Sequence, residues 1–330
     1  MNSKKINIGV IGSGHLGQYH VKHVYKRQNI NFLGLHDSNP ERGNAIAKKY
    51  ETKYFENVSN LMEVCDGVSI VTPTESHYDV AKIALNEFCC NVFIEKPITE
   101  TISQADDLIN HAQKNDLIIQ VGHIERLNPA LKALEKYDIN PKFIDIQRLA
   151  PYTARGTDVP VVLDLMIHDI DILLSLVKSK VKSIHASGVS ILTNSVDIAH
   201  ARIRFENGTV SSVTASRVAK DKVRKIKIFQ DNLYSTIDLL LEQTEIYNIT
   251  KDSNLIENAL QAEPFPGDNE KKYIVYEKPK IKNYDSLREE LNNFVNSILN
   301  IESPIVNGRE ARNALEVVIK INEMILEDLK

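Results

Sequence analysis

The sequence predicts an α/β protein with two domains: a doubly wound parallel sheet, then an α+β domain with a large, mostly antiparallel open sheet. Over the first third of the chain, short apolar strands alternate with helices, which is typical of a parallel sheet. From residue 181 to residue 250, strand-like runs follow one another without helices between them, which indicates antiparallel pairing. The 330 residues are enough for two cores. We expect one domain over 1–123 and a second over 124–330.

The first domain is expected to alternate regularly between strand and helix. Strands are expected at 5–12, 30–37, 53–55, 67–73, 91–97 and 117–123. Helices are expected after a glycine-rich turn at 12–17 and over 40–49, 58–64, 75–88 and 101–115. Ligands of such sheets lie beyond the carboxyl ends of the strands, so residues there are the first candidates for a site.

The second domain is expected to begin with a short helical stretch after Asn128-Pro129 and a strand of alternating pattern at 143–151. A largely apolar helix is expected at 161–174. Strand-like runs then occupy 181–192, 197–205, 208–218, 223–230, 234–241 and 244–250. The turn Glu206-Asn207-Gly208 between two of them is a hairpin signal.

The end of the chain is expected to return to helix. Residues 252–283 are charged and contain three prolines, so we expect a loop with one strand near 272–276. Two helices are expected to close the chain, at 285–299 and 308–329.

Composition excludes several classes of protein. A net charge of -4 gives no overall attraction to nucleic acid or to an anionic membrane, so neither is expected as a partner. No apolar run approaches the ~20 residues that span a bilayer. The start enters a strand at once, which leaves no room for a signal peptide. The three cysteines form no CxxC pair, so we expect a reduced, cytoplasmic compartment.

A glycine motif between the first strand and the first helix predicts a dinucleotide site. The motif is Gly12-Ser13-Gly14-His15-Leu16-Gly17, with GxGxxG spacing. The first glycine makes the turn, the second admits a pyrophosphate and the third lets the helix pack closely. Asp37, at the end of the second strand, is expected to accept hydrogen bonds from the adenosine ribose. No basic residue follows at Ser38 or Asn39, which favours NAD over NADP.

Other candidate cofactor contacts follow the later strands of the same sheet. Residues expected along this edge are Thr72, Pro73, Thr74, Glu95, Lys96 and His123. His77 would lie in the first turn of the next helix, where a structural capping role and a cofactor contact are both open.

The apolar helix at 161–174 carries polar residues that need an explanation. Taken as an α-helix at ~100° per residue, it places Asp164, His168 and Asp171 on one face, while Asp169 points elsewhere. Acids and a histidine on a largely buried helix are costly unless they are paired or used in chemistry. Both readings remain open from this segment alone.

These motifs, in this order, resemble those of the glucose–fructose oxidoreductase / inositol dehydrogenase family over nearly the whole chain. The four motifs are GSGHLGQYH, TPTESH, EKP at 95–97 and the D-x-x-x-H of LDLMIHDID. The resemblance implies a Rossmann domain and a catalytic group of Lys96, Asp164 and His168, with the Lys96–Pro97 bond often cis in relatives.

The resemblance also implies NAD-dependent oxidation of a secondary alcohol. His168 is assigned as general base, since its reference pKa of ~6.5 suits that task. Asp164 would hold its tautomer and stabilise the imidazolium. Lys96 would orient the hydroxyl and stabilise negative charge on its oxygen, or act as the base itself if burial lowers its pKa. Asp171 is expected to be a structural partner.

The segments around 121–130 and 158–162 are most similar to a bacterial subgroup that oxidises the 3-hydroxyl of UDP-N-acetylglucosamine for lipid A precursors. The resemblance therefore implies a sugar-nucleotide substrate. Expected substrate contacts are Lys96, His123, Arg126, Arg148, Tyr152, Arg155 and His168. The four at 126, 148, 152 and 155 are open to an alternative as surface salt-bridge residues.

Two further patterns are interpreted as structural. The basic stretch 217–227 lacks interleaved aromatic residues, which favours a solvated strand face over a nucleic-acid site. His15, His20 and His23 have no acid or cysteine at ligand spacing, so no metal is expected.

Two alternatives to the sugar-nucleotide dehydrogenase stay open. One keeps the chemistry with a free sugar or inositol as substrate. The other is a non-catalytic, dinucleotide-sensing regulator, although a regulator has no need of the base that the catalytic group supplies. By resemblance we expect a homo-oligomer, a dimer or a tetramer, that pairs through the open face of the second sheet.

Overall fold

A computed structural model describes residues 5–25, 27, 29–153, 159–267 and 271–330 of the chain. It divides the chain into two compact units. The first comprises Met1–Ile124 and Asp285–Glu316, and the second comprises Glu125–Tyr284 and Val317–Lys330. The chain therefore leaves the first unit once and returns to it near the end.

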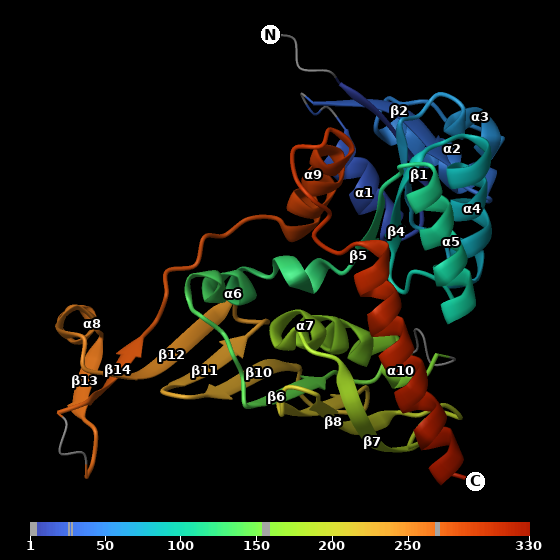
Figure 1. Cartoon of the computed structure of the whole chain (residues 1–330). Coiled ribbons are helices and arrows are strands. Elements are labelled where there is room, and N and C mark those ends of the chain that lie inside the picture. The colour runs from blue at the N-terminus through green and yellow to red at the C-terminus, as the bar shows by residue number, and fades with distance from the viewer. Residues whose placement is uncertain (1–4, 26, 28, 154–158, 268–270) are drawn as a thin grey trace. The chain divides into compact units, whose positions relative to one another are not determined.

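The first unit contains a five-stranded parallel sheet, as the sequence predicts (Figure 1). The strand order is β2-β1-β3-β4-β5. Strand β2 lies on one side of β1, and the chain then crosses over to place β3 on its other side. The strands are β1 (Ile6–Ile11), β2 (Ile30–His36), β3 (Gly67–Ile70), β4 (Asn91–Glu95) and β5 (Ile119–Gly122). The strand expected at 53–55 is reduced to an isolated bridge between Leu35 and Tyr54, because only two backbone hydrogen bonds join the segment to β2.

Helices cover both faces of this sheet. In Figure 1, α1 and α9 lie on one side of it, and α4 and α5 lie on the other. Two helix starts follow directly from sequence: the side chain of Asn39 caps α2, and Thr101 and Gln104 form a reciprocal capping box on α5. The helices are α1 (Gly17–Val24), α2 (Pro40–Lys49), α3 (Val58–Met62), α4 (His77–Glu87), α5 (Ile102–Lys114) and α9 (Ser286–Ile298), with a 3-10 turn η1 (Thr74–Ser76).

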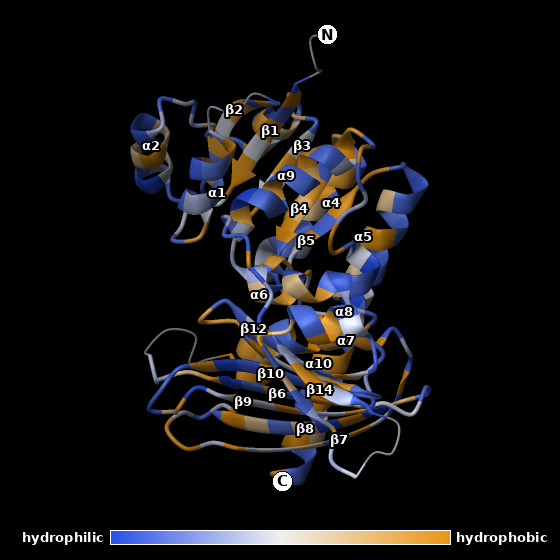
Figure 2. Cartoon of the chain, turned by 90° about the vertical axis from the view of Figure 1, so that its left-hand side faces the viewer, coloured by the Kyte–Doolittle hydropathy of each residue, from blue (hydrophilic) through white to orange (hydrophobic). Residues whose placement is uncertain are grey.

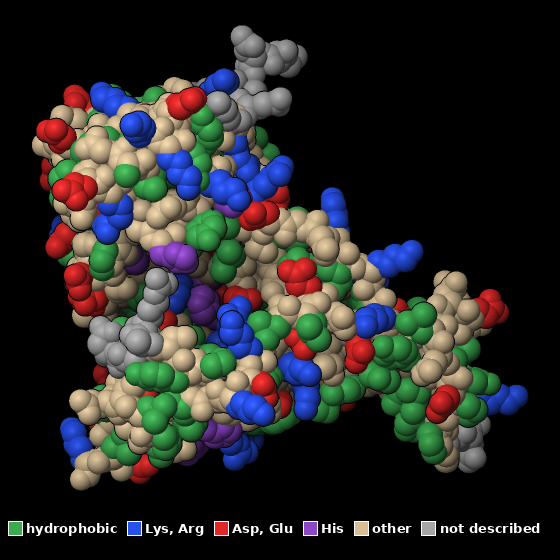
Figure 3. All heavy atoms as spheres, turned by 180° about the vertical axis from the view of Figure 1, so that it is seen from behind, with side chains coloured by type: hydrophobic (Ala, Val, Ile, Leu, Met, Phe, Trp, Pro, Cys, Tyr) green, Lys and Arg blue, Asp and Glu red, His purple; other side chains and the backbone are tan. Residues whose placement is uncertain are grey.

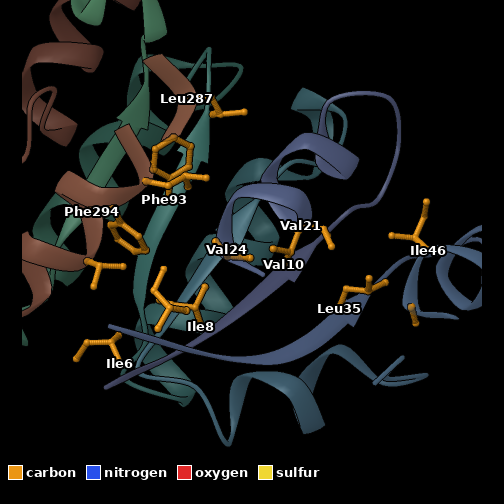
Figure 4. Packing of buried hydrophobic residues seen from close by; sticks show 14 residues of the cluster. Ile6, Ile8, Val10, Val21, Val24, Leu35, Ile46, Phe93, Leu287 and Phe294 are labelled. Carbon is orange, nitrogen blue, oxygen red and sulfur yellow. The ribbon is translucent and has the colours of Figure 1, made fainter. Parts of the chain in front are cut away.

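Helix α9 belongs to the core of the first unit, so the second unit does not extend without interruption over 124–330 as expected, although the chain does first leave the first unit near 124. Its buried residues Leu287, Leu291, Phe294 and Val295 join the cluster formed by β1, β2 and α1 (Figure 4). The rings of Phe294 and Phe93 meet edge-on, with centroids 5.8 Å apart. Periodicity reveals that α9 is amphipathic, but it does not say which sheet its apolar face covers.

The second unit contains a nine-stranded sheet in the order β13-β14-β12-β11-β10-β6-β9-β8-β7. All neighbours are antiparallel except β6 and β9, which run parallel. Buried residues alternate with more exposed ones along several of these strands, among them β8, and Figure 2 shows bands of alternating hydropathy on the sheet. The strands are β6 (Phe143–Leu149), β7 (Val181–Val189), β8 (Ile198–Phe205), β9 (Val210–Ser216), β10 (Val223–Gln230), β11 (Leu233–Asp238), β12 (Gln243–Thr250), β13 (Gln261–Pro264) and β14 (Tyr273–Glu277).

The predicted hairpin between β8 and β9 is confirmed. The two strands pair antiparallel, and Gly208 in the turn has a φ of +92°. The prediction for 252–283 is incomplete, because α8 (Ser253–Asn258) and the edge strand β13 lie there as well as β14. Every residue of β13 is exposed, so no apolar alternation marks it.

The remaining helices of the second unit include the segment with Asp164 and His168. They are the 3-10 turns η2 (Ile124–Leu127) and η3 (Ala133–Lys136), α6 (Pro129–Lys132), the π-helical turn η4 (Val162–Met166), α7 (Ile167–Val177) and the later part of α10 (Gly308–Asp328). Helix α10 begins in the first unit and ends in the second. Across the described residues, none of the helices is both long and apolar enough to cross a membrane.

Candidate active site

The loop between β1 and α1 has the geometry of a dinucleotide-binding turn. Gly12 has a φ of +90°, and a Cβ there would lie 2.6 Å from the carbonyl oxygen of Val71. A Cβ at Gly17 would lie 2.1 Å from the carbonyl oxygen of Gly12, so α1 starts too close to β1 for any other residue. A Cβ at Gly14 would meet no described atom within 4 Å. The first and third glycines serve the fold, whereas the second borders open space that suits the phosphates of a dinucleotide.

The other loop residues are divided between the interior and the surface. Ser13 is buried, and its backbone N and Oγ both donate to Oδ2 of Asp37 at 2.7 Å. His15 is exposed, with its ring edge-on to Tyr19 at 5.6 Å between centroids. Leu16, just before α1, is also exposed. Ser13 therefore joins the glycine loop to the end of β2.

Asp37 is held by a cation that the sequence analysis missed. Arg42 donates from Nε to Oδ2 at 2.9 Å and from Nη2 to Oδ1 at 2.7 Å. Burial alone would raise the pKa of Asp37, but hydrogen bonds from Arg42 and Ser13 outweigh it and hold that pKa well below its ordinary value. Our expectation of no nearby basic residue considered only Ser38 and Asn39. The Asn39 cap was the sequence signal that could have revealed Arg42. The cap starts α2 at Pro40, and the third residue of the helix, Arg42, then lies beside Asp37.

His77 contacts the backbone of the sheet edge. Its Nδ1 lies 2.9 Å from the carbonyl oxygen of Pro97, and its Nε2 lies 3.0 Å from that of Thr72. Burial lowers the pKa of His77 despite these two carbonyls. The ring thereby joins the segment after β3, which includes Thr72, Pro73 and Thr74, to the cis Lys96–Pro97 bond. These contacts give His77 a structural role, although not the capping role that was one expectation, because α4 has no side-chain cap hydrogen bond.

The side chain of Glu95 is held in place by two neighbours, His20 and Gly122. Its Oε1 lies 3.0 Å from Nε2 of buried His20, whose Nδ1 lies 2.8 Å from Oγ of Ser69. A Cβ at Gly122 would lie 2.7 Å from Oε1 of Glu95, so the glycine makes room for the carboxylate. Glu95 pairs with Gly122 in the β4–β5 ladder, and Lys96 comes next along the chain. These contacts fix the position of Glu95, which is the residue directly before Lys96.

Lys96 and His123 lie at the same edge of the sheet. Each directly follows one member of the Glu95–Gly122 pair, at the carboxyl ends of β4 and β5. His123 is buried, whereas Lys96 is partly exposed. The edge thus contains the amine expected from the resemblance together with an imidazole.

In the second unit, the helix that carries Asp164 and His168 is not a regular α-helix. Residues Val162–Met166 form a π-helical turn, and α7 begins only at Ile167. Asp164 lies in the wider turn and His168 lies in the first turn of α7, each partly buried. The value of ~100° per residue therefore does not hold between Asp164 and His168, and their shared face stays a prediction. Single π turns inside helices occur frequently at functional sites.

Two other acids of α7 are paired with arginines. Asp169 accepts hydrogen bonds from Nε and Nη2 of Arg148 at 2.8–3.0 Å, and Nη1 of Arg148 donates to Glu125 at 3.0 Å. Asp171 accepts from Nε and Nη2 of Arg126 at 2.7 and 3.0 Å. These pairs explain why an apolar helix carries carboxylates, and Asp171 has the structural partner that we expected.

The same pairs change the interpretation of the expected substrate contacts. Arg148 is 3% exposed and has its guanidinium between two acids, so we assign it a structural role in place of substrate binding. It is a buried cation, not the surface ion pair of the alternative. Arg126 is nearer the surface, and Tyr152 is 47% exposed. Arg155 lies outside the described residues.

Asp164 lines a pocket of about 150 Å³ within the second unit. Two cations line the same pocket, Arg217 after β9 and Lys222 before β10. Ala150, Pro151, Thr153 and Leu165 complete its described wall. The sequence analysis assigned 217–227 to a solvated face and so missed both cations. Nothing in the spacing of the chain relates them to Asp164.

Other parts of the basic stretch are balanced by acids. Nη1 of Arg224 lies 2.9 Å from Oε1 of Glu125, and Nζ of Lys225 lies 3.6 Å from Oδ2 of Asp238. On the face drawn in Figure 3, Lys and Arg side chains are interspersed with Asp and Glu side chains. This distribution agrees with the interpretation of β10 as a solvated strand.

The histidines near the glycine loop have separate environments. His20 contacts Ser69 and Glu95, while Nε2 of His23 lies 3.3 Å from Oδ2 of Asp285. No group of three or more His, Cys, Asp or Glu side chains within the described ranges is arranged to hold a metal ion.

The glycine loop at the end of β1 and the parallel sheet that carries it define the first unit as a dinucleotide-binding domain. A model of the oxidoreductase family with an NAD-binding Rossmann fold matches residues 6–123, and a GFO/IDH/MocA C-terminal domain model matches 146–232. UDP-N-acetylglucosamine 3-dehydrogenase of Acidithiobacillus ferrooxidans is 33% identical over 95% of each chain. The chain belongs to the GFO/IDH/MocA family of NAD-dependent oxidoreductases.

Solved structures agree with this assignment. UDP-N-acetylglucosamine 3-dehydrogenase from Acidithiobacillus ferrooxidans superposes with a TM-score of 0.88 at 30% identity, covering 99% of both chains. The apo scyllo-inositol dehydrogenase of Lactobacillus casei has a TM-score of 0.78 at 19% identity, which shows the shared fold. The myo-inositol 2-dehydrogenase of Thermotoga maritima is 24% identical over 94% of this chain and 93% of its own.

Proposed function

We propose that the chain oxidises a secondary hydroxyl of a sugar nucleotide to a ketone, at C3 of UDP-N-acetylglucosamine. The observation that carries the proposal is the similarity to UDP-N-acetylglucosamine 3-dehydrogenase along 95% of both chains. The resulting 3-keto sugar would be a substrate for an amination step toward lipid A precursors.

The first unit is assigned the cofactor. Bound NAD supplies a hydride acceptor at its nicotinamide ring. The residues proposed to hold it are Gly12, Ser13, Gly14, His15, Leu16, Gly17, Asp37, Thr72, Pro73, Thr74, His77, Glu95 and Lys96. The carboxylate of Asp37 would accept hydrogen bonds from the ribose hydroxyls, while Arg42 keeps that carboxylate ionised and fixed in position. His77 would act through the backbone that it holds.

Three side chains are assigned to the chemistry. His168 accepts the proton of the substrate hydroxyl as general base, and Asp164 fixes its tautomer and stabilises the imidazolium. Lys96 orients the hydroxyl and stabilises charge on its oxygen. The alternative in which Lys96 is the base uses the same three residues. His123, Arg126 and Tyr152 are retained as substrate contacts.

Surface features support the expected assembly and compartment. A row of aromatic rings crosses one face of the large sheet, with centroids 4.8–5.9 Å apart. The rings are Phe143, Phe229, Tyr234, Tyr247 and Tyr276, and three of them are at least 37% exposed. We propose that this face pairs with a second copy of the chain, giving a dimer or tetramer. Free Cys65, Cys89 and Cys90 agree with a cytoplasmic location.

The test is to incubate the purified protein with NAD and a panel of alcohols while monitoring NADH absorbance. The panel contains UDP-N-acetylglucosamine, other UDP-sugars, N-acetylglucosamine and myo-inositol. We expect NAD to be reduced when UDP-N-acetylglucosamine is present. NMR should identify the product as the 3-keto sugar nucleotide. Reduction of NAD with inositol but with no UDP-sugar would contradict the proposed substrate. If no alcohol supports reduction of NAD, the sensing regulator is favoured.

A further inference from the structure

The pocket around Asp164 has a charge pattern that the proposed chemistry does not use. Its described wall contains the cations Arg217 and Lys222 and one acid, Asp164. The described wall therefore places two cations beside an acid that is assigned to catalysis. The pocket volume of about 150 Å³ is well above the ~15 Å³ that one bound water needs, so the pocket has room for a phosphate group.

Arg217 is a built part of the fold. It is 6% exposed and donates to the carbonyl oxygen of Val159. Its Nε lies 4.0 Å from Oδ1 of Asp197. That carboxylate already accepts shorter hydrogen bonds, from the backbone amides of 191–193 and from Oγ1 of Thr193. These contacts hold the guanidinium of Arg217 at the pocket wall, where a cation attracts an anion.

Lys222 differs from the neighbouring cations of the same stretch. Arg224 and Lys225 are paired with Glu125 and Asp238. No such ion pair within the described residues holds Lys222, which is exposed at the pocket between β9 and β10. A flexible ammonium group at a pocket wall is suited to binding phosphate as a point charge.

We propose that Arg217 and Lys222 form the subsite for the phosphate of an anionic sugar substrate, so that the sugar ring lies toward Asp164. The inference rests on the proposed function and deepens it, because it makes the phosphate a requirement for binding. The diphosphate of a UDP-sugar and the monoester of a sugar phosphate share this chemistry. A neutral sugar or inositol carries no charge for the two cations to bind.

The first test compares Lys222→Gln with the matched control Lys220→Gln, which removes an exposed lysine two residues away that does not line the pocket. With saturating NAD, we expect KM for UDP-N-acetylglucosamine to rise about tenfold in Lys222→Gln, which is about 1.4 kcal/mol. The kcat should stay within about twofold, because the lost contact is equal in ground state and transition state. Equal KM values in the two variants would overturn the proposal.

The second test does not depend on turnover. Calorimetry measures binding of UDP, glucose 6-phosphate and N-acetylglucosamine to the full chain, wild type and both variants. We expect Lys222→Gln to lower the affinity for whichever phosphate-bearing ligand binds, and to leave the affinity for N-acetylglucosamine unchanged. The loss of affinity should be smaller at high salt. UDP or glucose 6-phosphate as the tighter ligand identifies the anion source.

The two tests separate the failure of each proposal. If wild type does not oxidise UDP-N-acetylglucosamine, the proposed function fails, while a Lys222-dependent binding of UDP or glucose 6-phosphate still supports the anion subsite. If wild type oxidises the UDP-sugar and neither ligand depends on Lys222, the subsite is wrong and the function stands. Lys222 is exposed, so unfolding midpoints should be equal in all three proteins.

Discussion

At the scale of single residues, carboxylates on the helical segment formed by η4 and α7 have two different roles. Asp169 and Asp171 are 1% exposed, and each is paired with an arginine. Asp164 instead lines a pocket and is assigned to catalysis. All three lie on one apolar segment, so burial and partners, not residue type, separate structural acids from the candidate catalytic acid.

Arg148 gives a test of the structural role. Replacing it in Arg148→Met leaves Asp169 buried without its cation, and the loss of one partner of a buried pair costs about 3–5 kcal/mol. We expect the free energy of unfolding in urea to fall by that amount. Arg224→Met is the control, because its half-exposed side chain pairs with the same Glu125 and should cost less than about 1 kcal/mol. Equal losses would show that Arg148 has no special structural role.

His168 gives a test of the proposed chemistry. In His168→Ala, turnover should fall by about 10²- to 10⁴-fold, the usual contribution of a general base. Affinity for NAD, measured by calorimetry, should be unchanged, because the glycine loop and Asp37 belong to the other unit. Near-normal turnover would remove the assigned base and favour Lys96 in that role.

Asp37 gives a test that depends on pH. Hydrogen bonds hold its folded-state pKa below the unfolded value of ~3.9, so its stabilising contribution is fully present above pH ~4 and is lost as pH falls below it. Asp37→Asn should therefore reduce the free energy of unfolding more at pH 7 than at pH 3. Urea titrations of both proteins at the two pH values measure this difference. A cost that does not change with pH would contradict the ionised pair with Arg42.

At the scale of elements, periodicity and turn chemistry predict most of the fold. Alternation of apolar residues predicts β6 and β8, and the Asn207-Gly208 turn predicts the hairpin after β8. The edge strand β13 cannot be predicted in this way, because all of its residues are exposed and its neighbour β14 supplies the pairing. The π turn at Val162–Met166 also cannot be predicted, because residues 161–167 are apolar at every position except Asp164 and a change of helical phase leaves no mark in the pattern.

The candidate site was predictable only where its residues are consecutive in the chain. The glycine loop and the residues that follow β4 lie at sheet edges that the strand pattern identifies. Arg42 follows from the cap of α2, so it was within reach of the sequence. Arg217 and Lys222 were not, because their position beside Asp164 depends on the tertiary packing of β9 and η4.

At the scale of the whole molecule, the chain is not divided at one point. Residues Asp285–Glu316 return to the first unit after the second sheet has been completed. Their helix α9 buries Leu287, Leu291 and Phe294 in the same cluster as Ile8 and Val10. Burial of each such side chain is worth about 1.5–3 kcal/mol, which is a large share of the stability of one domain. The boundary predicted from sequence thus omits part of the core of the cofactor unit.

This organisation predicts how fragments of the chain behave. A fragment of residues 1–124 lacks α9 and should expose the apolar surface that the helix covers, so we expect it to bind a hydrophobic dye and to lack measurable affinity for NAD. The same fragment joined through a Gly/Ser linker to residues 285–316 should unfold cooperatively and bind NAD. A fused control with Phe294→Ala should lose about 3–5 kcal/mol of stability, because the ring is 1% exposed against Phe93. Circular dichroism and calorimetry measure both properties. NAD binding by the 1–124 fragment alone, with a cooperative transition, would show that α9 is dispensable and that the division near residue 124 is sufficient.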